Sequence, residues 1–205
     1  MAYLRRYGRL TPAKFITSYY LGMMIPSSIL SLFMIASIMT MFYAGFIYHG
    51  YDISPTVVMP SSALGIIEVM GLALLTSLLM QAILFLLGVA AMNTSLKHVS
   101  RIAMIPFIIV FISFYTSLFL SLPEWALLIN PFMALMDSIV TTYTGLPSMP
   151  SQLSINMSGA PAINHGVPLT YGILSTIAWT IALTAAAVPL INKIKYKPPE
   201  EAREL

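Results

Sequence analysis

The sequence contains no cysteine. The chain can therefore form no disulfide and no thiolate metal site, and it offers no thiol nucleophile. Charged residues are also scarce, at 8% of the chain against roughly 25% in soluble domains. Hydrophobic residues make up 58%, and the mean hydropathy is +0.86. This balance excludes an ordinary soluble domain and predicts an integral membrane protein.

The long apolar runs predict the fold class. Lipid offers the backbone no hydrogen bonds, so only helices and closed barrels span a membrane. The runs do not alternate apolar with polar residues, and we therefore expect an all-α membrane protein. A spanning helix needs about 20 residues. Four segments reach that length: residues 15–50, 60–92, 102–122 and 168–192.

The remaining segments connect these spans within one transmembrane domain, residues 1–205, in which we find no internal repeat. Pro26, which two serines follow, is expected to bend the first span. The connecting segments are a basic start at 1–14, a polar loop at 93–101, a loop rich in Pro, Ser, Gly and Asn at 145–167 and a charged tail at 193–205.

The placement of cations predicts the orientation. Lys97 and Arg101 are the only Lys or Arg residues between Lys14 and Lys193. With four spans, all ten Lys and Arg residues lie on one side of the membrane. An excess of these residues marks the cytoplasmic face. We therefore expect a multi-pass protein of the cell membrane with both termini in the cytoplasm.

Residues 123–144 have the pattern of a broken helical hairpin. Ser121 with Glu124 three residues later predicts a helix start, in which the glutamate reaches back to the cap. Asn130, with a proline directly after it, predicts a second start, and Gly145 predicts a stop. A full fifth span here would place the basic tail outside, so we expect an external re-entrant hairpin.

The order of these features resembles the permease subunits of type-2 ATP-binding-cassette (ABC-2) transporters. The most specific stretch reads Leu122-Pro123-Glu124-Trp125, then Asn130-Pro131, then Asp137, and is similar to the segment after the family's fifth helix. Two further stretches are similar to the approach to the third helix and to the loop before the fifth: GRLTPAKFITSYYLGMMIPSSIL and FLLGVAAMNTSLKHVSRIAMIPFI. The resemblance covers roughly residues 5–195.

The resemblance implies a topology and a function. In that family the most specific stretch forms short extracellular re-entrant helices, and one last span follows them. The implied function is the membrane-spanning permease component of an ATP-driven exporter. It implies two partners, a separate cytosolic P-loop ATPase and a second permease chain of the same or a related kind. Family members typically have six spans, and this chain matches the last four.

The chain has no nucleotide-binding motif of its own. None of its eleven glycines precedes a lysine as a P-loop requires. ATP would therefore be hydrolysed on a partner chain, and we expect no enzyme activity, no cofactor and no nucleic-acid partner. Arg5, Arg6, Arg9 and Lys14 are the candidate contact with an ATPase. Their alternative role is to set the topology and to attract anionic headgroups of the lipid bilayer.

Glu68 lies inside the second predicted span. An ionisable residue at membrane depth is a functional candidate by default, so Glu68 is a candidate for the substrate path. The alternative is an interfacial carboxylate in contact with water. His49, His98 and His165 are far apart and lack metal-ligand spacing, so we expect no metal site.

The hairpin supplies the other site candidates, as an outer gate or substrate vestibule. These are Glu124, Trp125, Asn130, Pro131 and Asp137. In the alternative interpretation, Glu124 only caps a helix and Asp137 lies on a solvated helix face. The second function that we weigh is a non-transporting structural or accessory subunit of a larger membrane complex. Small residues of the last span would hold its partners.

Overall fold

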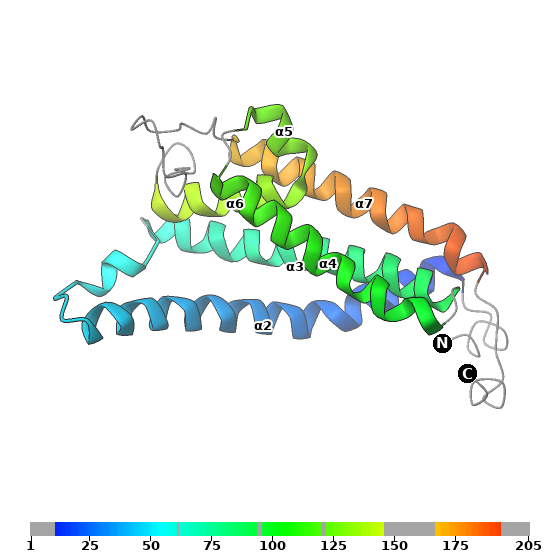
Figure 1. The fold of residues 1–205 in the computed structure, drawn as a ribbon, viewed down its shortest axis with the longest axis horizontal. Helices are drawn as coiled ribbons and strands as arrows, with labels where there is room; N and C mark the ends of the chain where they lie inside the picture. Colours follow the sequence, from blue (N-terminus) through cyan, green and yellow to red (C-terminus); the bar gives the residue numbers. More distant parts are fainter. Residues whose placement is uncertain (1–10, 61, 94–95, 120–121, 146–166, 194–205) are drawn as a thin grey trace.

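The computed structural model describes residues 11–60, 62–93, 96–119, 122–145 and 167–193. Every regular element in these ranges is helical, which confirms the all-α prediction. The elements are α2 (Pro12–Tyr48), the short 3-10 helix η1 (Pro55–Val58), α3 (Ala63–Met92), α4 (Leu96–Phe119), α5 (Glu124–Ile129), α6 (Pro131–Thr144) and α7 (Leu169–Lys193) (Figure 1).

Three stretches of the described chain are long and apolar enough to cross a membrane. They are α2, the stretch Pro55–Met92 that contains η1 and α3, and α7. Within the part of α4 whose side chains the structure describes, the apolar stretch Met104–Thr116 is shorter than a span. Three of the four predicted spans therefore correspond to stretches that are long and apolar enough to cross a membrane, and the fourth stays a prediction.

Local sequence signals explain where the first two long helices begin. Thr11 caps α2 by accepting a hydrogen bond from the Lys14 backbone N–H at 3.3 Å, and Pro12 is the first helical residue. Ser62 caps α3 in the same way, accepting from the Gly65 N–H at 2.9 Å. Pro26 lies within α2 and does not end it.

The predicted loop at 93–101 is wrong for most of its length. Asn93 caps the end of α3, and α4 already begins at Leu96. The polar residues there were interpreted as a loop, yet they include no Gly or Pro to break a helix. Where a helix leaves an apolar layer, polar side chains do not end it, because its backbone hydrogen bonds persist in water.

Helix α3 is the central element of the bundle. It packs against α7, α2, α6 and α4. Near its end, Phe85 and Val89 pack with Phe15 of α2 and Ile191 of α7. The first residues of α2 and the last residues of α7 therefore lie together at one end of the bundle, and α5 and α6 lie toward the other (Figure 1).

Helix α6 fits between α3 and α7 because each neighbour presents a glycine to it. A Cβ atom on Gly65 would lie 3.2 Å from the Thr142 carbonyl oxygen. A Cβ atom on Gly172 would overlap with Ser138 Oγ and lie 3.3 Å from the Ala134 carbonyl oxygen. Small residues let helix backbones approach this closely.

The contact of Gly172 with Ser138 can be tested by a double-mutant cycle. Gly172→Ala should lower the free energy of unfolding by about 1–3 kcal/mol, because the added methyl group is forced against Ser138 Oγ. Removing that oxygen by Ser138→Ala in the same chain should restore much of the loss. Unfolding in mild detergent, followed by circular dichroism, measures both effects. Simple additivity of the two substitutions would contradict this packing.

Candidate functional site at the α5–α6 hairpin

The hairpin turns back near the middle of the bundle. Its tip, Asn130 and Pro131, borders a hollow of about 400 Å³. Trp179 and Leu183, which flank the midpoint of α7, line the same hollow. From this tip α6 returns along α3, so that its far end reaches Gly65 near the start of α3. The two short helices therefore enter and leave the bundle at the same end.

Asn130 holds the break between the two helices. Its Oδ1 accepts a hydrogen bond from the Phe132 backbone N–H at 3.1 Å, which caps α6. Its Nδ2 donates to Ser113 Oγ of α4 at 2.8 Å. Ser113 is buried and donates in turn to the Ile109 carbonyl oxygen at 2.7 Å. The predicted cap at Asn130 and first helical position at Pro131 are confirmed, and the side chain also ties the hairpin to α4.

The end of α5 is also hydrogen-bonded by a neighbouring helix. Ser175 Oγ of α7 donates to the Leu128 carbonyl oxygen at 2.6 Å. The last carbonyl groups of a helix have no partner within it and must find one elsewhere. Side chains from α4 and α7 thus provide partners for backbone and side-chain groups on both sides of the break.

Asp137 is buried, with 2% of its surface exposed. Its Oδ2 accepts a hydrogen bond from the Val167 backbone N–H at 2.6 Å, just before α7 begins. The neighbouring Ser138 is buried as well. The predicted solvated face of α6 is therefore wrong. Helix α6 is covered by α3 on one side and α7 on another, so Asp137 and Ser138 face protein.

Helix α6 ends at Gly145, as predicted. Gly145 ends the helix in the left-handed conformation, with φ of 72°, and its N–H donates to the Thr141 carbonyl oxygen at 2.8 Å. The Tyr143 hydroxyl donates to the Val58 carbonyl oxygen of η1. Burial raises the pKa of Tyr143 above its ordinary value of 10.0.

Glu124 and Trp125 lie at the start of α5. The helix begins at Glu124, and Pro123 occupies the cap position without any side-chain hydrogen bond. The prediction that α5 starts directly after a cap at Ser121 is therefore wrong, because the cap position is Pro123. Ser121 itself lies outside the described residues. Glu124 is the first helical residue, and the positive end of the helix dipole stabilises a negatively charged side chain at this position. Trp125 is 66% exposed and does not pack into the hairpin core.

The other candidates are separate from the hairpin tip. Glu68 is half-buried in the second turn of α3, on the flank of the face that carries Gly65 and Val69. Lys14 is exposed in the first turn of α2, at the opposite end of the bundle from η1. The remaining predicted ATPase contacts, Arg5, Arg6 and Arg9, lie outside the described residues.

Sequence reasoning missed the partners of the hairpin. Ser113 and Ser175 each carry a hydroxyl group in an apolar helix, and nothing local marks them as hydrogen-bond partners of another element. The available signal was their position in apolar helices, since a polar side chain in a spanning helix usually serves a packing or functional contact. Among the described residues, no three His, Asp or Glu side chains gather closely enough to hold a metal ion.

Comparisons with protein-family models, with curated proteins and with solved structures find no match to this chain.

The two roles of Asn130 can be separated by substitution. Asn130→Ala removes the cap and the bond to Ser113, and should lower the free energy of unfolding by about 1–3 kcal/mol. Asn130→Ser keeps a capping oxygen and loses the bond to α4, so its cost should be about 1 kcal/mol and similar to that of Ser113→Ala. Thermal unfolding in detergent measures all three. Equal losses for Asn130→Ala and Asn130→Ser would contradict the capping role.

Proposed function

We propose that this chain is the membrane-spanning permease component of an ATP-driven exporter of the ABC-2 kind. The observation that carries the proposal is the re-entrant hairpin, whose tip at Asn130 and Pro131 turns back in mid-bundle. A short broken helix pair before a last span is the arrangement that the resemblance of Leu122-Pro123-Glu124-Trp125 implies. The chain would act with a separate cytosolic ATPase and a second permease chain.

The proposed topology has four spans with both termini in the cytoplasm. Helix α4 has 24 residues, which suffices for the roughly 30 Å hydrocarbon layer at 1.5 Å per residue. The start of α2 and the end of α7 lie at the same end of the bundle, in agreement with an even number of crossings. All ten Lys and Arg residues would then lie on the cytoplasmic side, as the positive-inside rule requires.

In the proposed mechanism the hairpin closes the outer end of a translocation path. Glu124 and Trp125 lie at its entrance, Asn130 and Pro131 form its tip, and Asp137 fastens it to α7. The ATPase would bind at the other end, where Lys14 is exposed and where Arg5, Arg6 and Arg9 precede α2. Its nucleotide cycle would shift the helices between inward-open and outward-open arrangements.

The surface of α2 supports a partner within the membrane. Its most apolar stretch has no buried residue, and large side chains such as Phe33, Met41 and Phe42 are exposed along it. One bundle of this size leaves much of its longest helix without a protein neighbour. A second permease chain, in addition to lipid, would cover that surface.

One observation favours a second candidate, a non-transporting structural subunit. The hairpin is fastened to α4, α7 and η1 by Asn130, Ser175 and Tyr143, and Gly172 locks α6 against α7. These hydrogen bonds and this close packing suit a rigid scaffold for other membrane subunits. The two candidates differ in their partners, which can be identified directly.

The proposal is tested by isolating the tagged chain from its native membrane in mild detergent and identifying its partners. We expect a stoichiometric P-loop ATPase, and Arg5→Glu, Arg6→Glu and Arg9→Glu together should reduce its recovery at least about tenfold. The matched control reverses Lys193, Lys195 and Lys197 in the tail, which should retain the ATPase. Recovery of other membrane subunits without an ATPase would contradict the exporter and favour the scaffold.

A further inference from the structure

The first turns of α2 are anchored in the bundle. Phe15 is buried in a cluster with Phe85 of α3 and Ile191 of α7. Further along α2, the Tyr20 and Thr184 hydroxyl groups lie 2.6 Å apart and join α2 to α7. These contacts fix the beginning of α2 relative to α3 and α7.

Helix α2 then continues through a proline. Pro26 has no N–H to donate, so the helix lacks one backbone hydrogen bond at this point. Ser28 Oγ donates to the Met24 carbonyl oxygen at 2.6 Å, a kind of bond that often bends a helix. Gln81 of α3 is buried, and its Nε2 donates to Ser27 Oγ at 2.6 Å. The side chain of Gln81 therefore holds α2 directly after the proline, where the backbone of α2 is weakest.

Beyond this region the polar attachment of α2 to the bundle ends. The last polar pair is formed by the hydroxyl groups of Ser31 and Ser77, which lie 2.5 Å apart. We call residues 32–48 the outer arm. Among the described residues, no side chain of the outer arm forms a hydrogen bond to another helix, and Thr40 donates only to Ala36 of α2 itself. Helix α6 is not among the described elements against which α2 packs.

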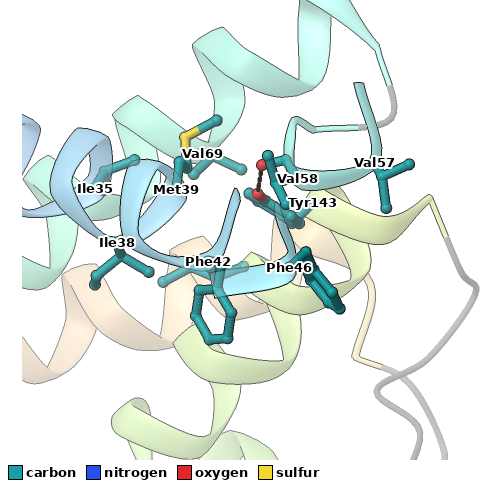
Figure 2. A pocket seen from close by; sticks show the side chains of 10 residues that line it. Ile35, Ile38, Met39, Phe42, Phe46, Val57, Val58, Val69 and Tyr143 are labelled. Atoms are coloured by element: carbon teal, nitrogen blue, oxygen red, sulfur yellow. Dashed lines mark hydrogen bonds between the residues drawn. The ribbon is translucent and has the colours of Figure 1, made fainter. Parts of the chain in front are cut away.

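A hollow separates the outer arm from α6. Its volume is about 450 Å³, and it lies between the arm, η1, α3 and α6 (Figure 2). Phe42 lines it from the arm, and Val69 and Ile139 line it from α3 and α6. The hydrogen bond from Tyr143 to the Val58 carbonyl oxygen joins α6 to η1. The far walls of the hollow are thus held together, and the outer arm is not held to them.

We propose that α2 has a hinge at Pro26, which Gln81 holds against α3, and that the outer arm swings about this hinge to close the hollow. The structure has the open position. Bending at Pro26 breaks no backbone hydrogen bond of that residue, because the proline has already removed it. Residues 49–54, which follow the helix as a turn and an irregular link, let the arm move while η1 stays bound to α6.

Closure gains packing contacts. In lipid, helices associate through van der Waals contacts and hydrogen bonds, because lipid tails are as apolar as the side chains. Phe42 on the arm and Val69 and Ile139 opposite lose such contacts across an unfilled hollow. The movement needs neither an ATPase nor a second permease chain. The inference therefore goes beyond the exporter proposal, and the purified chain alone is sufficient to test it.

The test measures distances between pairs of spin labels by pulsed electron paramagnetic resonance, in phosphatidylcholine nanodiscs. The chain has no cysteine of its own, so Met41→Cys on the outer arm and Tyr171→Cys on α7 label two exposed sites specifically. Met41 lies about 22 Å along the helix from Pro26, so a change in bend of about 10° moves it by about 4 Å. We expect two populations of the distance between positions 41 and 171, separated by about that amount.

The matched control pair lies on the anchored side of the hinge. Leu21→Cys, before Pro26, and Ile181→Cys on α7 are also exposed sites. Because the first turns of α2 are fixed to α3 and α7, this pair should give one narrow distance. If the pair at positions 41 and 171 gives a single distance as narrow as the control, the arm does not swing and the proposal is overturned. A lipid chain that permanently fills the hollow would give this result.

Two variants locate the movement. Pro26→Ala restores the missing N–H and stiffens the helix, so it should leave one population of the distance between positions 41 and 171. Val57→Trp fills the hollow from η1, where Val57 is exposed, and should remove the closed population. Both populations surviving in both variants would overturn the hinge. If Pro26→Ala does not fold, unchanged populations in Val57→Trp alone would overturn it.

Discussion

The hairpin depends on one constraint, which is that a helix broken among apolar side chains leaves backbone groups that water cannot reach. At this break the chain provides partners from its own side chains. Asn130 accepts from the first free N–H of α6 and donates to α4, and Ser175 donates to a carbonyl group near the end of α5. Without these three bonds the turn would leave polar groups near the break without partners, which costs free energy in an apolar environment.

The hydrogen bonds that hold the hairpin tip also determine how α6 packs against the rest of the bundle. Because α6 returns along α3, it fills the space between α3 and α7, and both neighbours meet it through glycine. Asp137 then joins α6 to Val167, two residues before α7 begins, so the hairpin positions the start of the last helix. Helix α2 takes little part in this core, and its most apolar stretch has no buried residue.

Local signals predicted much of this architecture, and long-range contacts account for what was missed. The apolar runs, the cap at Asn130 and the stop at Gly145 follow from short-range chemistry, and the structure has them as predicted. The burial of Asp137 could not be predicted, because helical spacing gives two faces but does not say how many neighbours cover them. The start of α4 at Leu96 was missed because polarity was taken as a sign of a loop.

The central claim is that residues 123–144 turn back inside the bundle and do not cross the membrane. The absence of cysteine makes single introduced cysteines clean reporters of sidedness. In intact cells, a membrane-impermeant maleimide should label Ser158→Cys, whereas His98→Cys and Ala202→Cys should react only after permeabilisation. Labelling of Ala202→Cys in intact cells would mean an odd number of crossings and would contradict the account.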